Sequence, residues 1–343
     1  MPRTAALRDW VHERFESDFP GQQLPIEAAS ADASFRRYFR VRLPDQTARI
    51  VMDAPPEKED CRPFMAVAAL LKGAGVHVPE VLAHDLAQGF LLLSDLGSTT
   101  YLSALQDRST APQLYHDANQ ALLAIQLASR PGVLPDYDHA LLSLELALFP
   151  EWYLRRHLAL TLDDRQQATL KTTFAAILDN NLRQPRVFVH RDYHSRNLML
   201  VGGGTGAFPA SPGVLDFQDA VYGPLTYDLV SLYRDAYIDW PEEHELDYVI
   251  RYWEAARGAA LPVASDFHDF YRDYEWMGAQ RQLKVLGIFA RLCHRDGKSN
   301  YLADMPRVLS YLRRTCQRYR ELRPLARLLD AVEDRQVDVG YSF

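Results

Sequence analysis

Two short segments decide how this chain folds: VFVHRDYHSRNLML at residues 187–200 and VLDFQDA at residues 214–220. In the first segment an apolar run enters a short polar loop and a second apolar run leaves it, which predicts two strands joined by a tight turn. In the second segment an apolar run again ends at an acidic residue. Asp192 and Asn197 therefore share one loop, and Asp216 stands at the end of a separate strand.

The polar residues of this loop have the spacing used for phosphoryl transfer. In HRDxxxxN the Asp orients or deprotonates an attacking hydroxyl, and the Asn five residues later holds a magnesium ion. Asp216 is the natural second ligand, because Mg²⁺ prefers a few carboxylate and amide oxygens together with phosphate oxygens. An isolated HxD carries little weight, but the ordered set of strands and polar residues is specific. We therefore predict Asp192, Asn197 and Asp216 as catalytic residues, the last two as metal ligands.

The composition limits the class of protein. A chain of 343 residues with 48% hydrophobic residues can bury a large core and is long enough for two lobes. Its formal net charge of −7 gives no general basic footprint for nucleic acid, and its apolar runs are too short or too charged to span a bilayer. The amphipathic N-terminus carries early acidic residues and does not resemble a signal peptide. Cys61, Cys293 and Cys316 lie far apart, which favours reduced thiols in the cytoplasm over a disulfide framework or a zinc site.

The first part of the chain has the pattern of a small sheet with two helices. One apolar stripe predicts an amphipathic helix at residues 4–18, and a second helix is expected at 60–73. The stretch 28–43 joins a loop of small residues to an alternating strand, which forms a hairpin with the next strand, at residues 48–54. Two more strands are expected at 78–85 and 89–97.

From residue 97 onward the pattern is mainly helical. The Asp163 side chain is expected to cap one helix that ends before Pro185. The Gly- and Pro-rich insert at residues 202–213 separates two strands and is no phosphate loop, because no Lys follows it and no helix opens after it. Helices are expected near 99–107, 111–129, 140–159, 163–183, 224–235, 241–257, 266–294 and 301–320.

The order of these features resembles the aminoglycoside phosphotransferase and choline-kinase-like branch of the protein-kinase fold. DFQ replaces DFG, no activation loop separates it from YGPLTYDLVSL, and no APE follows. The resemblance implies an α+β, two-lobe fold: an N-lobe of residues 1–96 with a small antiparallel sheet, and a mainly helical C-lobe of residues 97–343. It also implies that Asp228 braces the catalytic loop. The alternative is a first-turn helix Asp favoured by the helix dipole.

The resemblance places the nucleotide against the N-lobe, where the sequence departs from the family pattern in two linked ways. The loop before the first hairpin strand lacks GxGxxG, although its small side chains still let backbone amides approach a phosphate. No lysine occurs between residues 41 and 57, where kinases carry the phosphate-pairing Lys, and the helix at 60–73 holds no Glu partner. An arginine could take that charge, because guanidinium grips phosphate at two points. The candidates are Arg36, Arg37, Arg40 and Arg49, with a solvated strand face as the alternative for each.

The strand that ends at Ser94 occupies the place of the kinase hinge. Backbone groups there would hydrogen-bond adenine, so side-chain identity matters little; an exposed strand exit is the alternative. The predicted nucleotide-binding residues are Ser34, Phe35, Arg36, Arg37, Arg49, Ser94, Asp95 and Leu96.

The acceptor is expected to bind against a helix at residues 143–158. Glu145, Trp152 and Arg155 combine the acid, indole and guanidinium groups that sugar pockets use for hydroxyl bonding, stacking and anion pairing. A Trp among Leu neighbours at helical spacing is also typical of a core. From Arg281 to Arg327, twelve Lys or Arg against three acids favour an anionic acceptor over a polycation, unless these charges form solvated faces.

Six short motifs spread over nearly the whole chain: DASFRRYFR, VMDAPPEKED, SDLG, LELALFPEWYL, HRDYHSRNLM and LDFQDAVYGPLTYDLVSLYRDAYI. They resemble the bacterial cytoplasmic kinases that phosphorylate N-acetylmuramate and N-acetylglucosamine at the anomeric hydroxyl in cell-wall recycling. That family also lacks the strand lysine. The resemblance implies a monomeric cytoplasmic sugar 1-kinase that uses ATP and Mg²⁺ and feeds UDP-sugar synthesis. An aminoglycoside or amino-alcohol kinase of the same fold and a non-catalytic nucleotide-binding regulator are the alternatives.

Overall fold

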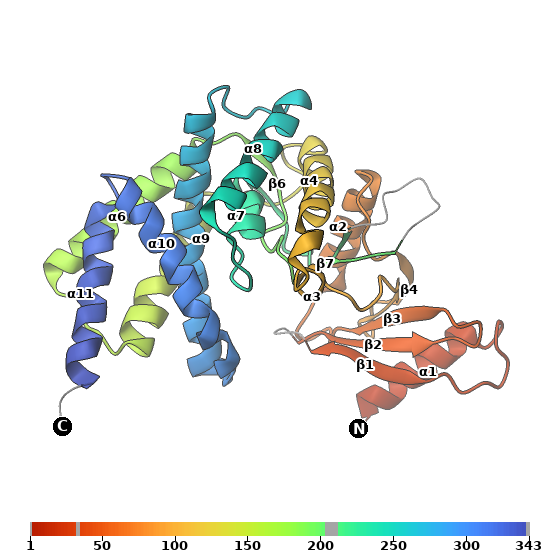
Figure 1. The fold of residues 1–343 in the computed structure, drawn as a ribbon. Coiled ribbons are helices and arrows are strands. Elements are labelled where there is room, and N and C mark those ends of the chain that lie inside the picture. The colour runs from red at the N-terminus through yellow and green to blue at the C-terminus, as the bar shows by residue number, and fades with distance from the viewer. Residues whose placement is uncertain (1, 32–34, 203–211, 341–343) are drawn as a thin grey trace. The chain divides into compact units, whose positions relative to one another are not determined.

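The computed structural model describes residues 2–31, 35–202 and 212–340 (Figure 1). Two compact units make up the chain. Unit 1 is Met1–Ala104 with Asn197–Asp219, and unit 2 is Leu105–Arg196 with Ala220–Phe343. The division between the units falls inside the HRDxxxxN loop. Ser34 and most of the Gly- and Pro-rich insert lie outside the described residues.

Unit 1 is built on a five-stranded antiparallel sheet with the strand order β1-β2-β3-β5-β4. The predicted hairpin of β2 and β3 is confirmed, with Arg37 opposite Asp53 at one end. One strand was not predicted: small residues expected to form a loop pair with β2 instead, because tertiary pairing overrides weak strand propensity. The strands are β1 (Ile26–Ala31), β2 (Arg37–Arg42), β3 (Ala48–Asp53), β4 (Val81–Asp85) and β5 (Phe90–Ser94).

Helix α1 (Pro2–Phe15) covers one face of this sheet (Figure 1). Its predicted apolar stripe is buried against strand residues, so this helix is confirmed together with its core-facing side. The contacting residues are Leu7, Trp10, Val11 and Phe15 with Val41, Val51, Phe90 and Leu92. The other elements of unit 1 are α2 (Cys61–Gly73), α3 (Tyr101–Ala104), β7 (Leu198–Met199) and β8 (Gly213–Val214).

Unit 2 is organised around α9 (Phe267–Asp296), the long helix that packs against most of the other helices in this unit (Figure 1). Its middle turns are buried on all sides, as expected for a central helix. Around it lie α4 (Ala111–Leu127), α5 (His139–Leu146), η2 (Phe149–His157), α6 (Asp164–Leu182), α7 (Tyr227–Tyr233), α8 (Glu242–Gly258), α10 (Met305–Arg318) and α11 (Arg323–Gly340), with the 3₁₀ turns η1 (Arg108–Thr110) and η3 (Ser299–Asp304). Strands β6 (Arg186–Val189) and β9 (Val221–Pro224) form a two-stranded antiparallel sheet.

The helix predicted at 140–159 is two elements, α5 and the π-helix η2. Pro150 lies in the first turn of η2, where its missing backbone N–H is tolerated. In the interior of one continuous helix the same proline would remove a hydrogen bond and break the helix. Gly287 of α9 lets this region approach closely, since a Cβ there would lie 2.5 Å from the carbonyl carbon of Leu148. The capping box at Asp163 is confirmed, and α11 was not predicted.

The α+β class is confirmed by the five-stranded antiparallel sheet of unit 1 and the mainly helical unit 2. All three cysteines are free. Within residues 2–31, 35–202 and 212–340, we find no helix with the length and apolarity of a bilayer span. The lobe boundary at residues 96 and 97 stays a prediction.

Candidate active site

In unit 2, Asp228 fixes the start of the HRDxxxxN loop. It lies in the first turn of α7, fully buried, and its two carboxylate oxygens accept from the backbone N–H groups of His190, at 2.6 Å, and Arg191, at 2.9 Å. Both readings of Asp228 are therefore correct: it is a first-turn helix residue and it braces the loop. Burial raises the pKa of this carboxyl to about 7, even though both N–H donors favour the ionised form.

Further contacts hold the rest of the loop. The Tyr193 hydroxyl donates to the carbonyl of Ala118 at 2.8 Å, and the Ser195 N–H donates to Asp235 at 2.9 Å. Asp235 was not singled out in the sequence, because it lies forty residues from Ser195 and no local spacing marks the pair. Contacts on three sides make this a loop of defined conformation.

Asp192 lies in a positively charged environment. Burial alone would raise the pKa of its carboxyl, but Lys284, His194 and Arg281 outweigh it and hold that pKa at about 2. Lys284 donates to the Tyr227 hydroxyl at 2.8 Å and pairs with Glu145 at 3.0 Å. Arg281 donates to the Ser231 hydroxyl at 2.7 Å. Asp192 is therefore a carboxylate at neutral pH, a form that can only accept hydrogen bonds.

We call Asp192 and its charged neighbours the Asp192 cluster. Glu145 is its second acid and is almost fully buried. It pairs with Arg191 at 2.6 Å and with Lys284 at 3.0 Å, and it accepts from the Tyr137 hydroxyl. The members of the cluster are Glu145, Arg191, Asp192, Arg281 and Lys284.

In unit 1, the two predicted metal ligands face each other. Strands β7 and β8 pair, and the Leu215 N–H donates to the carbonyl of Asn197 at 2.9 Å. This pairing brings the Asn197 amide nitrogen within 3.4 Å of one carboxylate oxygen of Asp216. The Gln218 side chain donates to the other oxygen at 2.8 Å. Amide and carboxylate oxygens together are the donor set that Mg²⁺ prefers.

Two residues of these segments have left-handed backbone. Arg191 has φ = 77° and Asp216 has φ = 62°. A non-glycine residue in this region costs about 1–2 kcal/mol, and such strain concentrates at functional sites where the surrounding contacts enforce it. Here Asp228 holds one of the two positions and the β7–β8 pairing leads into the other.

The predicted nucleotide-binding residues that the structure describes near the first hairpin differ in their contacts. The Phe35 ring is 60% exposed, with the Lys58 ammonium 4.7 Å from its centre. Arg36 pairs with Glu59, while Arg49 donates to the carbonyl of Ala48 at 2.8 Å. Arg37 pairs with the fully buried Asp53, whose carboxylate also accepts from Arg3 at 2.7 Å. Their roles toward a nucleotide stay predictions.

The predicted hinge residues lie at the end of β5 and directly after it. The Ser94 hydroxyl accepts from the backbone N–H of Glu80 at 2.8 Å. Asp95 accepts from Arg40 at 2.6 and 3.0 Å, and Leu96 is buried. The side chains are thus used within unit 1, which agrees with a hinge that would act through its backbone.

The three predicted acceptor residues have unequal surroundings. Glu145 is buried in the Asp192 cluster. Trp152 lies under the Arg156 guanidinium, 4.4 Å from its ring centre, and the exposed Arg155 pairs with Glu151. Trp152 and Arg155 both belong to the π-helix η2, a conformation found frequently at functional sites.

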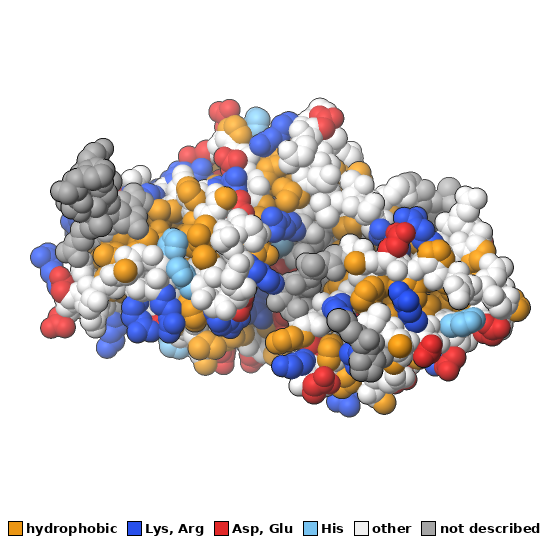
Figure 2. All heavy atoms as spheres, turned by 90° about the horizontal axis from the view of Figure 1, so that it is seen from below, with side chains coloured by type: hydrophobic (Ala, Val, Ile, Leu, Met, Phe, Trp, Pro, Cys, Tyr) orange, Lys and Arg blue, Asp and Glu red, His pale blue; other side chains and the backbone are white. Residues whose placement is uncertain are grey.

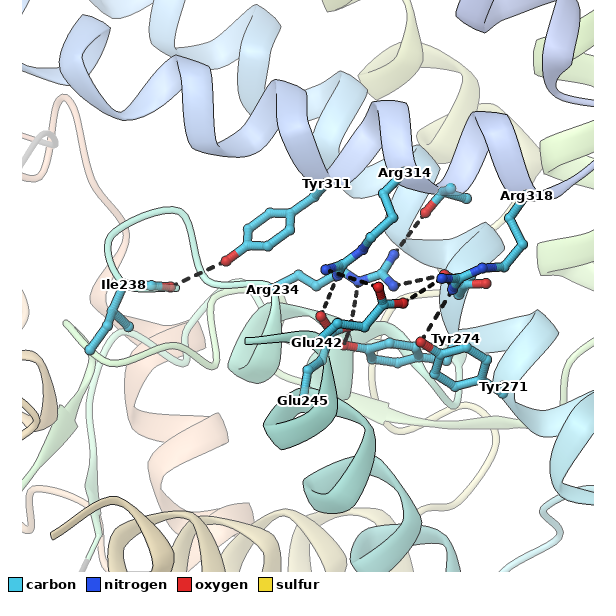
Figure 3. Close-up of polar contacts among 11 residues, drawn as sticks. Arg234, Ile238, Glu242, Glu245, Tyr271, Tyr274, Tyr311, Arg314 and Arg318 are labelled. Atoms are coloured by element: carbon cyan, nitrogen blue, oxygen red, sulfur yellow. Dashed lines mark hydrogen bonds and ion pairs between the residues drawn. The ribbon is translucent and has the colours of Figure 1, made fainter. Parts of the chain in front are cut away.

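The basic segment near the C-terminus is partly neutralised by acids from other helices (Figure 3). Arg314 and Arg318 of α10 pair with Glu242 and Glu245 of α8, and Arg318 also pairs with a buried acid of α9. The charge count along the sequence missed these partners. We call this group the Arg234 cluster: Arg234, Glu242, Glu245, Glu275, Arg314 and Arg318.

The surface gives the same impression of mixed charge. In the space-filling view, blue and red side chains are interspersed among apolar and uncharged ones on the face shown (Figure 2). The excess of Lys and Arg in one segment is therefore weak support for an anionic acceptor.

Comparison with known proteins gives the family. Residues 25–266 match the model of the phosphotransferase enzyme family. The chain is 47% identical to an N-acetylmuramate/N-acetylglucosamine kinase of Neisseria meningitidis serogroup B, with 100% of both chains covered. It is 51% identical to a protein of the same name from Pseudomonas aeruginosa, with 94% of each chain covered.

Among solved structures, an ethanolamine kinase of Plasmodium vivax is similar with a TM-score of 0.63 at 11% identity, covering 90% of this chain and 87% of that one. At that identity the likeness concerns the fold alone, and it confirms the protein-kinase-like fold expected from the motifs. Since the family model covers most of the chain and full-length relatives share about half of its residues, this protein belongs to the phosphotransferase enzyme family.

Proposed function

We propose that this protein is an ATP-dependent kinase that phosphorylates the anomeric hydroxyl of N-acetylmuramate and N-acetylglucosamine. The observation that carries the reaction class is Asp192, a carboxylate kept ionised in a loop that Asp228 holds. The choice of sugars rests on the two relatives named for them. The resulting sugar 1-phosphates would be used in peptidoglycan recycling toward UDP-sugars, by a monomer in the cytoplasm.

Asp192 would accept a hydrogen bond from the C1 hydroxyl. With a pKa of about 2 it is a weak base, so its main contribution is to orient the oxygen toward the γ-phosphorus. Weak basicity suffices, because an anomeric hydroxyl is more acidic than an ordinary alcohol. As the new P–O bond forms, the bond between the γ-phosphorus and the β–γ bridging oxygen breaks. ADP leaves with that electron pair, and the hydroxyl proton passes through Asp192 to solvent.

Asn197 and Asp216 would hold Mg²⁺, which neutralises charge on the ATP phosphates when it is bound. The donor set fits, because half a turn of the Asn197 amide exchanges its nitrogen for its oxygen beside Asp216. No cluster of three or more His, Cys, Asp or Glu that could bind a metal occurs in the described part of the chain. Phosphate oxygens and water would therefore complete the coordination.

The other predicted contacts complete the proposal. Adenine would bind the backbone of Ser94, Asp95 and Leu96, and the sugar would contact Trp152 and Arg155. Glu145 would contribute indirectly, by holding Arg191 and Lys284 of the Asp192 cluster in place.

The test is a phosphate-transfer assay with N-acetylmuramate, N-acetylglucosamine, kanamycin and ethanolamine as separate acceptors. We expect ADP release only with the two amino sugars, and a product whose phosphate is released in mild acid, as an anomeric phosphate is. Turnover with kanamycin or ethanolamine alone would replace the substrate. Binding of Mg·ATP without any transfer would favour the non-catalytic regulator.

A further inference from the structure

In the described part of unit 1, three of the four arginines that could replace the strand lysine form an ion pair with a carboxylate. The position of the partner carboxylate indicates whether the arginine stabilises the fold or is available for a nucleotide. The pairs are Arg36 with Glu59, Arg37 with Asp53 and Arg40 with Asp95.

Two of these pairs hold the sheet and its neighbours together. Asp53 is shared between Arg37 of β2 and Arg3 of α1, so it joins the first helix to the sheet. Arg40 uses both its Nε and one Nη on Asp95, and that Nη also donates to the carbonyl of Gly97 at 2.8 Å. The contacts of Arg37 and Arg40 thus have a structural role in unit 1.

The Arg36–Glu59 pair leads instead to the segment that carries Asp216. Arg36 Nε donates to Glu59 at 3.2 Å, and the backbone N–H of Phe35 donates to the same carboxylate at 3.4 Å. Glu59 directly precedes the N-cap of α2, and Phe64 in the first turns of α2 contacts Phe217, with ring centres 4.8 Å apart. One helical turn and one ring contact thus connect Glu59 to the residue after Asp216.

We propose that Arg36, positioned by Glu59, is the cation that grips the ATP phosphates in place of the strand lysine. This rests on the proposed function. Kinases use a Lys–Glu ion pair for this purpose, with the Glu on the helix that follows the hairpin. Sequence reasoning found no Glu within residues 60–73, but Glu59 lies one position before that range. Arg36 and Glu59 would thus stand in for that pair, with Glu59 placed just before α2 instead of within it.

The surroundings suit a phosphate-binding cation. The side chains of Arg36 and Glu59 are only 11% and 15% exposed, so solvent screens their charges less than at the surface. Burial lowers the pKa of Arg36, but Tyr38 and Glu59 raise it above its usual value overall, so the guanidinium stays charged. Its planar set of N–H donors can serve a carboxylate and a phosphate together.

The test measures binding of Mg·ADP and of adenosine by calorimetry to Arg36→Met, Arg36→Lys and Glu59→Gln. We expect Arg36→Met to weaken Mg·ADP by about 10- to 100-fold, the size of a lost charged hydrogen bond, with adenosine changed less than about twofold. Arg36→Lys should regain part of the affinity for Mg·ADP. The affinity of Glu59→Gln should lie between those of Arg36→Lys and the wild type. In turnover, the KM for ATP should rise while the KM for the sugar stays unchanged.

Arg42→Met is the matched control. Arg42 lies at the far end of β2, the strand that begins directly after Arg36. It also pairs with an acid, Glu27 at 3.5 Å, but its side chain is 61% exposed. It should bind Mg·ADP as the wild type does. If Arg36→Met folds and binds Mg·ADP normally, the assignment is wrong; if it fails to fold, normal binding by both Arg36→Lys and Glu59→Gln overturns it equally. Absence of sugar turnover in the wild type would refute the proposed function instead, and leaves the Mg·ADP comparison decisive for Arg36.

Discussion

Unit 2 holds two clusters of acids and arginines or lysines, each with members on α9, and the two clusters differ in how their cations act on their acids. In the Arg234 cluster every acid is bonded directly to a guanidinium; Arg234 itself reaches Glu245 at 2.6 Å and Glu275 at 2.9 Å. In the Asp192 cluster, Glu145 is likewise paired with Arg191 and Lys284. Asp192 differs, because Lys284 and Arg281 act on it through their charge while they donate to the Tyr227 and Ser231 hydroxyls. The same residue types thus stabilise the packing of helices in the Arg234 cluster and keep Asp192 ionised in the Asp192 cluster.

The difference gives a rule for reading buried charges. A buried cation bonded to two acids is expected to matter for stability, because its loss leaves both acids without a partner in a low-dielectric interior. A carboxylate kept ionised by cations that bond elsewhere is expected to matter for activity. Substitutions in the two clusters should therefore separate stability from turnover.

The largest effect is expected for Asp192→Ala. Turnover should fall by about 10²- to 10⁴-fold, the range for a positioned acid–base group, while Mg·ADP binding persists. Steady-state kinetics and calorimetry on the same preparation measure both quantities. Turnover within about threefold of the wild type would remove Asp192 from the mechanism.

Arg234→Met should produce the converse result. The free energy of unfolding should fall by about 3–5 kcal/mol, because Glu245 and Glu275 lose the cation between them. Turnover per folded molecule should not change. Urea unfolding gives the first quantity, and an activity assay well below the melting temperature gives the second. Loss of turnover without loss of stability would mean that the two clusters do not differ as described.

Asp228→Asn probes a third arrangement, an acid held by neutral amides. An Asn offers one acceptor oxygen where two N–H groups need one each, so stability should fall by about 1–3 kcal/mol near pH 6. The pKa of Asp228 is raised to about 7 from about 3.9 for a free Asp, so its stabilising effect is complete below about pH 4 and is lost as the pH rises through 7.

The gap between wild type and Asp228→Asn should therefore narrow from pH 5.5 to pH 8.5 in urea unfolding. This occurs because the wild type then carries the cost of a buried charge that the variant lacks. Parallel curves for the two proteins over this range would contradict the raised pKa.

The smallest effect is expected for Arg251→Ala, which tests the exposed limit of the comparison. Arg251 pairs with Asp247 one turn away at 2.7 Å, but the two side chains are 68% and 51% exposed. Solvent and salt screen such a pair, so the midpoint of urea unfolding should stay within the scatter of repeated measurements on the wild type. A loss as large as that of Arg234→Met would show that burial does not distinguish these pairs.

Sequence reasoning found the parts of the site whose residues are close along the chain. Asp192 and Asn197 follow from their spacing within one loop, and Asp216 follows from its place at the end of the next apolar run. Pairing of β7 with β8 then brings Asn197 and Asp216 together as expected. The helices with strong caps or apolar periodicity were also predictable, as the Asp163 capping box shows.

The charged partners could not be found in this way. Arg318 and Glu242 are 76 positions apart, and Lys284 lies far from Asp192, so no periodic signal links them. Counting charges in one segment gave a net sign but not the acids that other helices supply. Strand β1 was missed for a related reason, since its small residues form a strand only when β2 offers them hydrogen bonds.

The shared carboxylate of Asp53 has a practical consequence for anyone preparing this protein. Arg3 and Arg37 both pair with this carboxylate. A preparation that lacks residues 1–3 would leave Asp53 dependent on Arg37 and loosen the attachment of α1. The mass of a preparation should therefore be checked for loss of this segment before low activity is attributed to its catalytic residues.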